Sequence, residues 1–258
     1  MTRASPRVLT AACIGLFLFM YGPLLVLILF SFNATEYGIS WQGFTLKWYE
    51  DVLTNENLRH ALKVSLMVAV PCVLISTAIG TLTAFAIYRT RFLGRGLFQG
   101  VLYIPLLMPD LVMGVTLLLL FTSLGISLGI MSILLAHVSF SIPLATLVII
   151  GRMARIDRRL EEAAMDLGAD ELTTMRKVTL PLLMPGILAA ALLVFPWSFN
   201  DFVITYFVSG VGSSTLPLRV YSMIRLGVSP TVNALGTLIV VVPLVIVVLG
   251  MLMEKRRV

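Results

Sequence analysis

The sequence predicts an all-α integral membrane protein with six transmembrane helices in one domain that covers residues 1–258. Apolar residues make up 59% of the chain and charged residues only 12%, whereas a soluble domain carries about 25% charged residues. The mean hydropathy is +0.99. Six apolar segments are each long enough for the roughly 20 residues that a helix needs to cross the hydrocarbon core.

The six predicted spans follow one another along the whole chain. They are residues 8–32, 63–88, 97–121, 131–150, 182–208 and 232–253. The first is too long for the apolar core of a signal peptide and lacks a small-residue cleavage site, so we expect it to be retained. Cys13 and Cys72 lie within spans with no CxxC pattern, and we expect no disulfide and no metal site there.

The basic residues predict the orientation of these spans. Fourteen of the nineteen Lys and Arg residues lie in the N-terminal segment, in the loops 89–95 and 152–177, and in the C-terminal tail. Because short loops rich in Lys and Arg remain in the cytoplasm, we expect both termini and these loops on that side. The basic residues are scattered between spans rather than clustered on one face, which argues against nucleic acid as a partner.

Two segments on the opposite side predict short helices. Residues 33–62 contain several aromatic residues suited to the lipid headgroup level, so we expect a short interfacial helix there. Residues 209–231 open with a Gly- and Ser-rich stretch and then carry Pro217 and Pro230 at the two ends of a possible short helix. This second segment is expected to form an irregular loop at an outer vestibule.

The loop between the fourth and fifth predicted spans, residues 152–181, is rich in charge and is named here the coupling loop. Residues 157–167 predict a helix with Asp157 as its N-cap, and Gly168 permits the positive φ that ends a helix. A second short helix is expected over residues 170–177. Arg176 and Lys177 would close it at the end where cations suit the helix dipole, and Pro181 would redirect the chain.

A specific spacing runs through the coupling loop. Glu162-Ala163-Ala164 is followed by three residues and Gly168, then by nine residues, Val178, one residue and Leu180-Pro181. This pattern resembles the EAA loop by which the permeases of ABC importers engage their ATPase subunits. The alternative is a solvated loop whose basic residues reflect only the positive-inside rule.

The chain carries no pattern typical of an enzyme. It has no G-x-x-x-x-G-K-[ST] motif, no HExxH, no GxSxG and no convincing Ser/His/Asp set. We therefore expect no catalytic residue, metal or cofactor on this chain, with ATP and Mg bound by partner subunits. His137 lies alone in the fourth span, where a hydrogen-bonded packing role is expected.

Asp110 and Asp201 are the acidic residues that fall within predicted spans. A charged side chain at the bilayer centre costs about 2.5–3.5 kcal/mol on insertion scales, so each implies a protein-facing or aqueous environment. Asp110 follows Met108-Pro109, which should break the third span. Asp201 follows Asn200 and lies near Trp197 and Tyr206, whose π faces suit a cation. We expect these five residues (Asp110, Trp197, Asn200, Asp201 and Tyr206) to line a substrate pathway; alternatively, Asp110 caps a broken helix and Asp201 binds backbone or a partner subunit.

Along its whole length the chain resembles the permeases of polyamine (spermidine/putrescine) ABC importers, in the binding-protein-dependent transport permease family. The matching stretches are YGISWQGFT from Tyr37, KWY from Lys47, YRTRF from Tyr88, MPD from Met108, EEAAMDLGA from Glu161 and GVSPTVNAL from Gly227. One departure is Asn200-Asp201, where two adjacent aspartates are expected in this family. The loss of one negative charge there leaves room for a different cation preference.

The resemblance implies an ABC importer permease fold and a bacterial inner-membrane complex. The expected partners of this chain are a second related permease in a heterodimer, two cytoplasmic ABC ATPase subunits, a periplasmic polyamine-binding protein and membrane lipid. ATP binding would move the coupling loop and switch the pathway between outward and inward access.

Three other readings stay open at this point. The chain could be an ABC permease for another solute, such as ferric iron, thiamine or an oxyanion, although Asp110 and Asp201 argue against an anion. An ion-coupled secondary transporter would use the two aspartates as a relay, but no inverted repeat is evident. A membrane-embedded enzyme lacks a catalytic constellation.

Overall fold

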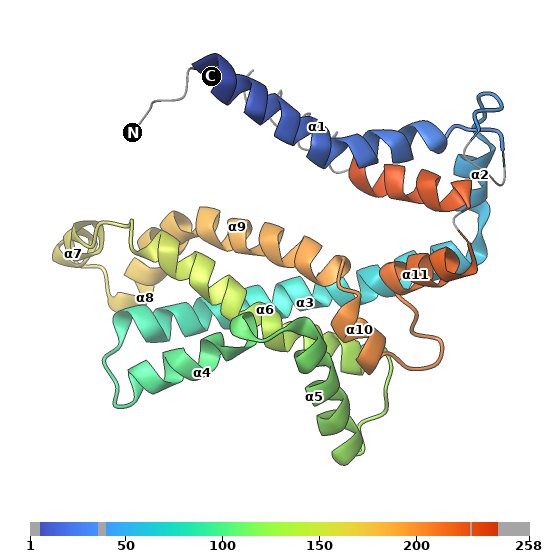
Figure 1. Ribbon diagram of the computed structural model, residues 1–258. Helices are drawn as coiled ribbons and strands as arrows, with labels where there is room; N and C mark the ends of the chain where they lie inside the picture. Colours follow the sequence, from blue (N-terminus) through green and yellow to red (C-terminus); the bar gives the residue numbers. More distant parts are fainter. Residues whose placement is uncertain (1–5, 36–39, 228, 242–258) are drawn as a thin grey trace. The chain divides into compact units, whose positions relative to one another are not determined.

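The computed structural model describes residues 6–35, 40–227 and 229–241, and over these residues the chain is helical with connecting loops (Figure 1). The elements are α1 (Pro6–Phe30), α2 (Lys47–Thr54), α3 (Glu56–Arg89), α4 (Arg95–Leu107), α5 (Asp110–Ser123), α6 (Ile130–Met153), α7 (Arg159–Asp166), α8 (Glu171–Thr174), the π-helical turn η1 (Met175–Thr179), α9 (Leu180–Phe199), α10 (Val203–Val208) and α11 (Leu216–Leu226). A further apolar helix covers Pro230–Val241. The predicted all-α class is confirmed.

Several helices are long and apolar enough to cross a membrane. In the described part of the chain these are Arg7–Phe30, α3, α6 and the continuous run Glu171–Phe199, with α4 and α5 as a fifth if the bent pair is one span. The predicted sixth span, 232–253, lies for the most part outside the described residues. The protein is therefore a multi-pass membrane protein, and the count of six spans stays a prediction.

The predicted third span is broken. Helix α4 ends at Leu107, α5 begins at Asp110, and the two axes differ by 108°. Pro109 causes the break because its ring fixes φ and disfavours a helical conformation at Met108, whose ψ is 138°. The fifth predicted span, 182–208, is also interrupted, since α9 ends at Phe199 and α10 begins at Val203.

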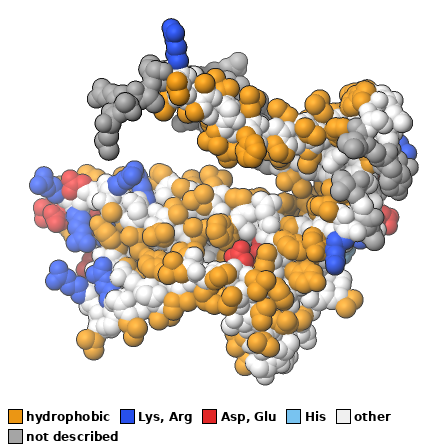
Figure 2. All heavy atoms as spheres, viewed as in Figure 1, with side chains coloured by type: hydrophobic (Ala, Val, Ile, Leu, Met, Phe, Trp, Pro, Cys, Tyr) orange, Lys and Arg blue, Asp and Glu red, His pale blue; other side chains and the backbone are white. Residues whose placement is uncertain are grey.

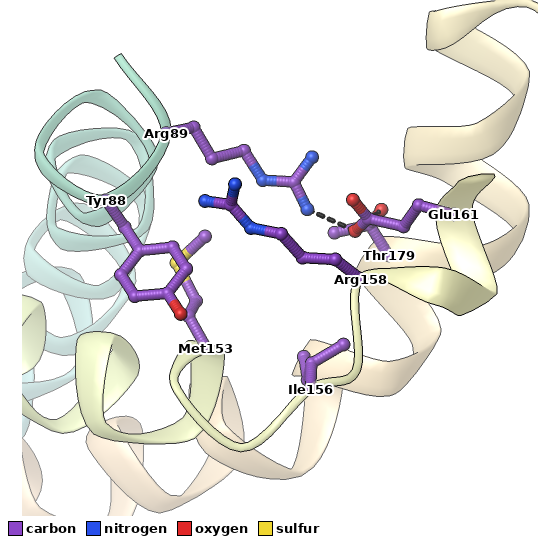
Figure 3. A pocket seen from close by; sticks show the side chains of 7 residues that line it. All are labelled: Tyr88, Arg89, Met153, Ile156, Arg158, Glu161 and Thr179. Carbon is purple, nitrogen blue, oxygen red and sulfur yellow. Dashed lines mark hydrogen bonds and ion pairs between the residues drawn. The ribbon is translucent and has the colours of Figure 1, made fainter. Parts of the chain in front are cut away.

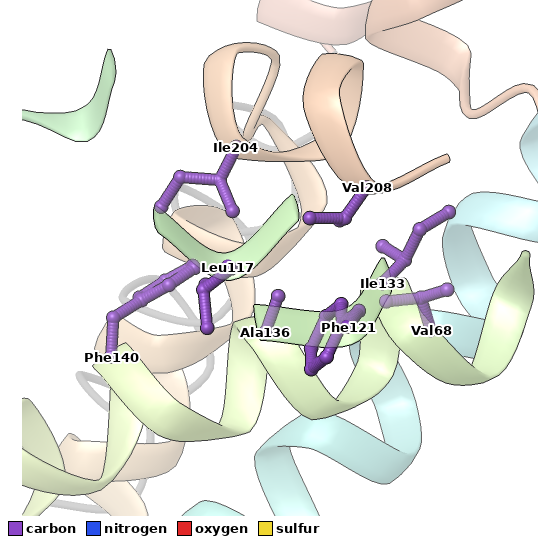
Figure 4. Packing of buried hydrophobic residues seen from close by; sticks show 8 residues of the cluster. All are labelled: Val68, Leu117, Phe121, Ile133, Ala136, Phe140, Ile204 and Val208. Carbon is purple, nitrogen blue, oxygen red and sulfur yellow. The ribbon is translucent and has the colours of Figure 1, made fainter. Parts of the chain in front are cut away.

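The chain forms two compact units, and the larger one comprises residues 60–218. One apolar cluster in this unit joins α3, α5, α6 and α10 (Figure 4), and its buried members are Val68, Leu117, Phe121, Ile133, Ala136, Phe140, Ile204 and Val208. A second cluster joins α3, α6 and α9 through Cys72, Ala84, Ala145, Ile149, Met153, Leu183, Ala190 and Val194. Helices α3 and α6 contribute to both clusters and so form the centre of the unit.

Small residues allow close contact between these helices, as is usual where lipid removes the hydrophobic drive for helix association. A Cβ added to Gly80 on α3 would lie 2.8 Å from Ala145 Cβ on α6. A Cβ added to Gly186 on α9 would lie 2.5 Å from Arg152 Cβ. The Arg152 guanidinium donates from Nε and Nη2 to the carbonyl of Leu182, at 3.1 and 3.0 Å, and so fixes the end of α6 against α9.

The smaller unit comprises residues 1–59 and 219–258. An antiparallel bridge joins Asn33 to Phe44, and the buried indole of Trp48 donates to the Asn33 carbonyl at 2.7 Å. These contacts position α2, which confirms the predicted short helix within residues 33–62. The second predicted short helix, between Pro217 and Pro230, is confirmed as α11.

Candidate functional site

The coupling loop is built around Gly168. Gly168 has φ +90°, which confirms the predicted left-handed turn at the end of α7. Its N–H donates to the Met165 carbonyl at 2.9 Å, and the Ala169 N–H donates to the Ala164 carbonyl at 3.1 Å. These two bonds are the pattern of a Schellman motif, which satisfies carbonyl groups at a helix C-terminus. The loop therefore turns sharply from α7 into α8.

The first helix of the coupling loop begins later than its sequence predicts. The N-cap of α7 is Arg158, so the expected cap at Asp157 is wrong by one residue. The Asp157 carboxylate still accepts the Arg159 N–H at 3.0 Å, two residues along the chain. This local bond forms a turn that leads into the helix, because an Asp side chain readily binds the backbone two residues on.

The second half of the coupling loop departs from the prediction. The predicted short helix over residues 170–177 does not end there. Instead, α8, η1 and α9 form one continuous helical run from Glu171 to Phe199. The widened π turn admits Pro181, which has no N–H to donate, at the start of α9. Arg176 and Lys177 therefore lie inside a helical run, and their expected role at a helix C-terminus is wrong.

Asp170 caps the start of this run. Its Oδ1 accepts the Thr173 N–H at 3.2 Å. Hydrogen bonding with the Thr173 side chain, and with its N–H, holds the pKa of the Asp170 carboxyl below its usual value. The carboxylate thus compensates one of the free N–H groups that a helix leaves at its N-terminus.

The EAA residues lie on the outer face of α7. Glu162 and Ala163 are exposed and Ala164 is half-buried. Large apolar side chains of the same loop are also exposed, namely Leu160, Met165, Leu167 and Leu172. Figure 2 shows basic and acidic side chains gathered over the end of the larger unit that carries α7. A surface with exposed apolar residues and charges of both signs is typical of a protein–protein contact.

Leu180 and Pro181, the last two residues of the motif, lie at a distance along the chain from this face. Leu180 is half-buried and Pro181 is exposed at the first turn of α9. The motif therefore has two parts in the structure. One part presents a surface on α7, and the other part marks where the loop becomes a span.

Glu161 is a residue whose position the sequence reasoning missed. It is the buried residue of α7, with 8% of its surface exposed. Its Oε1 accepts a hydrogen bond from the Thr179 hydroxyl at 2.6 Å and forms an ion pair with Arg89 (Figure 3). The three-residue spacing from Glu161 to Ala164 places both on one face of α7, but only the packing of the helices makes that face the inner one.

Asp110 lies in the first turn of α5. Pro109 is the N-cap residue, and no side chain caps this helix. The Asp110 side chain is exposed, and its carboxylate forms no hydrogen bond or ion pair with the residues that the structure describes. The alternative in which its side chain caps the broken helix is therefore wrong, although an acidic residue in the first turn suits the helix dipole.

Asp201 lies in the break between α9 and α10 and is almost enclosed. Its Oδ2 accepts the N–H and the hydroxyl of Thr205, at 2.8 and 2.7 Å. His137 Nε2 lies 3.3 Å from the same oxygen. The expected alternative role of binding backbone is thus confirmed for Asp201, which ties the first turn of α10 to the break.

His137 connects this break to α6. Its side chain is buried, with Nδ1 2.8 Å from the Ser198 hydroxyl and Nε2 2.9 Å from the Thr205 hydroxyl. The expected hydrogen-bonded packing role of His137 is confirmed. The ring joins α6, the end of α9 and α10 through buried polar contacts, which fixes the relative positions of three helices.

The other predicted pathway residues near this break are exposed, whereas Asp201 is almost enclosed. Trp197 and Tyr206 are each 52% exposed, and Asn200 is also exposed. Tyr206 packs against Phe202 and Phe207, with ring centroids 5.8 and 5.6 Å apart. Within the described ranges no hydrogen bond or ion pair joins Asp110 to Asp201. The structure therefore brings Asp201 together with His137, a residue that was not expected at this site.

The described residues hold no group of three or more His, Cys, Asp or Glu side chains that could bind a metal ion. Cys13 is exposed and Cys72 is buried, and both are free thiols.

A family model described as binding-protein-dependent transport system inner membrane component matches residues 76–257. The spermidine/putrescine transport system permease protein PotC of Escherichia coli K12 is 43% identical over 94% of this chain and 92% of its own length. The PotC of Haemophilus influenzae is 44% identical, with 93% of each chain covered. The putrescine transport system permease protein PotI of E. coli K12 is 40% identical over 86% of this chain and 82% of its own.

Solved structures share the fold. A chain of a bacterial ABC transporter involved in the import of the acidic polysaccharide alginate aligns with a TM-score of 0.74 at 16% identity, over 97% of this chain and 94% of that one. A chain of the alginate transporter in complex with an alginate pentasaccharide-bound periplasmic protein gives 0.73 at 18% identity, over 97% and 93%. At these identities the likeness concerns the fold and not the transported solute.

Proposed function

The chain belongs to the family of binding-protein-dependent transport system inner membrane components, and from this premise we propose that it is a permease subunit of an ATP-driven polyamine importer. In this proposal it moves spermidine or putrescine across a bacterial inner membrane by alternating access. The observation that carries it is the 43% identity to a spermidine/putrescine permease over 94% of the chain. The 40% identity to a putrescine permease points to the same class of cation.

The proposed topology has six spans, with both termini and the coupling loop in the cytoplasm. The distribution of Lys and Arg supports this orientation. It places the surface of α7 where cytoplasmic subunits can reach it. The broken ends of α4 and α9 then lie along the path through the membrane, where interrupted backbone is tolerated only against protein or water.

The proposed partners are a second related permease in a heterodimer, two ABC ATPase subunits and a periplasmic polyamine-binding protein. The ATPases would bind ATP and Mg and dock on the face of α7 that carries Glu162, Ala163 and Ala164. The 90% exposed Leu167 supports this, because exposed apolar side chains that gather on one surface mark a site of protein–protein contact. Closure of the ATPases would then displace α7 and change the access of the pathway.

The proposed substrate pathway includes Asp110, Trp197, Asn200, Asp201 and Tyr206. Polyamines are extended polycations, so carboxylates attract their charge and aromatic faces accept their ammonium groups. All the hydrogen bonds of Asp201 with described residues use Oδ2. In the proposal Oδ1 is the oxygen that meets the cation. Asp110, Trp197 and Tyr206 are exposed and offer the remaining charge and π surface.

The test of the substrate is uptake of radiolabelled spermidine and putrescine by a polyamine-uptake-deficient bacterium that expresses the complete complex. ATP-dependent uptake by the wild type is expected, and Asp201→Asn should reduce it while the complex still assembles. An assembled wild-type complex with active ATPases and no polyamine uptake would redirect the proposal to another cation. Uptake by the chain without ATPases would instead indicate an ion-coupled transporter.

The test of docking uses Glu162→Ala and Gly168→Pro. Each is expected to impair ATPase stimulation while the permease still inserts into the membrane. Glu162→Ala removes an exposed carboxylate from the proposed contact, and Gly168→Pro prevents the positive φ that turns the loop. Wild-type uptake and wild-type ATPase stimulation in both variants would contradict the proposed docking of the ATPases on α7.

A further inference from the structure

Two adjacent glutamates of α7 lie in opposite environments. Glu162 is exposed, whereas Glu161 is 8% exposed and faces into the larger unit. A carboxylate is retained in such a place only when it is paired and hydrogen-bonded, because burial removes its hydration. The contacts of Glu161 meet this condition, so the two residues have different tasks.

One oxygen of Glu161 joins three segments that are distant in the sequence. Glu161 Oε1 accepts from the Thr179 hydroxyl at 2.6 Å and pairs with the Arg89 guanidinium, as Figure 3 shows. Arg89 is the last residue of α3, and its guanidinium also lies 5.3 Å from the centre of the Phe85 ring. Thr179 is buried at the end of η1, directly before α9. A hydrogen-bonded ion pair of this kind is stronger than a neutral hydrogen bond.

Among the described residues, α7 otherwise contacts α8 and η1, the two segments that follow it in the chain. It is eight residues long and is joined to the rest of the chain by the turn before Arg159 and by the left-handed turn at Gly168. Near its start, the Arg158 guanidinium lies 5.6 Å from the centre of the Tyr88 ring, which is a weaker contact. A short helix between two turns can tilt without moving its neighbours unless a buried contact links them.

We propose that Glu161 is the positioning residue that links displacement of α7 to movement of α3 and α9. This inference rests on the proposed docking of ATPases on α7. In it, Glu162 belongs to the surface that the ATPase contacts, whereas Glu161 contacts no ATPase and carries the displacement inward. The displacement then acts on the end of α3 through Arg89 and on the start of α9 through Thr179.

The test uses the purified complex in lipid nanodiscs, in a Cys13→Ser background with a reporter thiol introduced by Asn200→Cys at the far end of α9. The rate at which a maleimide labels this thiol is measured without nucleotide and after ATP with vanadate. This readout reports movement of α9 and does not require the solute to be known. ATP hydrolysis and co-purification of the ATPases are measured on the same samples.

Glu161→Ala is expected to retain the ATPases and hydrolyse ATP, while the nucleotide-dependent change in labelling falls by roughly tenfold, within the range of allosteric couplings. Glu162→Ala is the matched control at the adjacent position and should lose ATPase co-purification instead. Glu171→Ala, an exposed carboxylate of the same loop, should behave as the wild type. Full nucleotide-dependent labelling in Glu161→Ala would overturn the inference.

A covalent rescue separates linkage from folding. In a Cys13→Ser background without the reporter thiol, Glu161→Cys with Thr179→Cys should weaken the nucleotide-dependent change in hydrogen exchange of the α9 amides. A short bis-methanethiosulfonate linker between the two thiols should restore this change until reductant is added. A linked sample that stays unresponsive would overturn the inference. Wild-type labelling that ignores nucleotide, or ATPases that do not co-purify with the wild type, would contradict the proposed function itself.

Discussion

His137 Nε2 lies 3.3 Å from Asp201 Oδ2 inside the larger unit. The hydroxyl of Thr205 determines which ring nitrogen of His137 carries a hydrogen. The Thr205 hydroxyl donates to Asp201 Oδ2 at 2.7 Å, so its oxygen is an acceptor for His137 Nε2 at 2.9 Å. His137 Nε2 therefore carries a hydrogen. The imidazole thus supports the carboxylate through Thr205, and the break between α9 and α10 depends on this group.

Asp201→Asn and Asp201→Ala should separate the charge of Asp201 from its capping role. An Asn side chain keeps an oxygen that can accept the Thr205 N–H, so the thermal stability of the purified permease should stay close to wild type. An Ala side chain removes the acceptor, and stability should fall by about 1 kcal/mol, as for the loss of a helix cap. Polyamine uptake should fall in both variants, because both lose the negative charge.

The measurements are thermal unfolding of the detergent-purified complex and radiolabelled uptake. Equal uptake by Asp201→Asn and the wild type would restrict Asp201 to its structural role. A large loss of stability in Asp201→Asn would show that the charge itself supports the break.

His137→Phe should destabilise the larger unit by about 1–3 kcal/mol, because a ring of similar size leaves buried hydroxyl groups without their partner. Ser198 and Thr205 lose the imidazole nitrogens that lie 2.8 and 2.9 Å away. The midpoint of thermal unfolding measures the effect. His60→Asn, at an exposed position of α3, is the control and should leave the midpoint unchanged. An unchanged midpoint in His137→Phe would mean that these contacts contribute little.

Gly210→Ala should prevent correct folding. A Cβ at this position would lie 2.0 Å from the Leu128 carbonyl oxygen and 2.5 Å from its carbon, and backbone atoms cannot move aside as a flexible side chain can. The expected cost is about 3 kcal/mol or more, at the upper end for overpacking. Gly100→Ala on α4 meets nothing within 4 Å and is the matched control. Monodisperse elution and a normal yield of Gly210→Ala would contradict this geometry.

Gly168→Ala should strain the turn after α7 by about 1–2 kcal/mol, because a side chain disfavours the left-handed conformation. Gly168→Asn should cost less, since Asn tolerates that conformation better than other residues. Nothing lies within 4 Å of the added Cβ, so the effect would come from the backbone alone. Hydrogen exchange of the α7 amides measures it, and equal exchange in both variants would argue against strain at φ +90°.

The Asp170 cap should depend on pH with a defined sign. Hydrogen bonds with Thr173 lower the pKa of Asp170 in the folded protein. The stabilisation is therefore fully present above the ordinary Asp value of about 3.9 and is lost as the pH falls through the lowered pKa. Protection of the Thr173 amide, measured by hydrogen exchange, should fade in that acidic range. In Asp170→Asn, which keeps an acceptor that does not titrate, protection should show no such step.

Local patterns in the sequence predicted the features that local chemistry determines. Hydropathy placed the fourth span at 131–150, and α6 covers Ile130–Met153. Pro109 indicated the break before α5, and Gly168 indicated the turn after α7, because each residue restricts or permits particular backbone angles whatever surrounds it. The matching stretches in turn indicated the family.

Contacts between distant segments could not be predicted in this way. Glu161 pairs with a residue 72 positions earlier, and His137 bonds with residues 61 and 68 positions later. The sequence spacing carries no information on these distances until the helices are packed. The π turn before Pro181 was missed for a related reason, since the helical run is held against α6 by Arg152 and continues where a proline would otherwise interrupt it.

The π turn Met175–Thr179 also sets the rotational phase between α8 and α9. Each residue of an α-helix advances about 100° around the axis and 1.5 Å along it. Insertion of one residue into α8 would leave a continuous helical run, yet it would swing α7 by about a quarter of a turn relative to α9. Thr179 would then no longer face Glu161. The number of residues between Gly168 and Val178, which is nine, therefore determines the direction in which the α7 surface points.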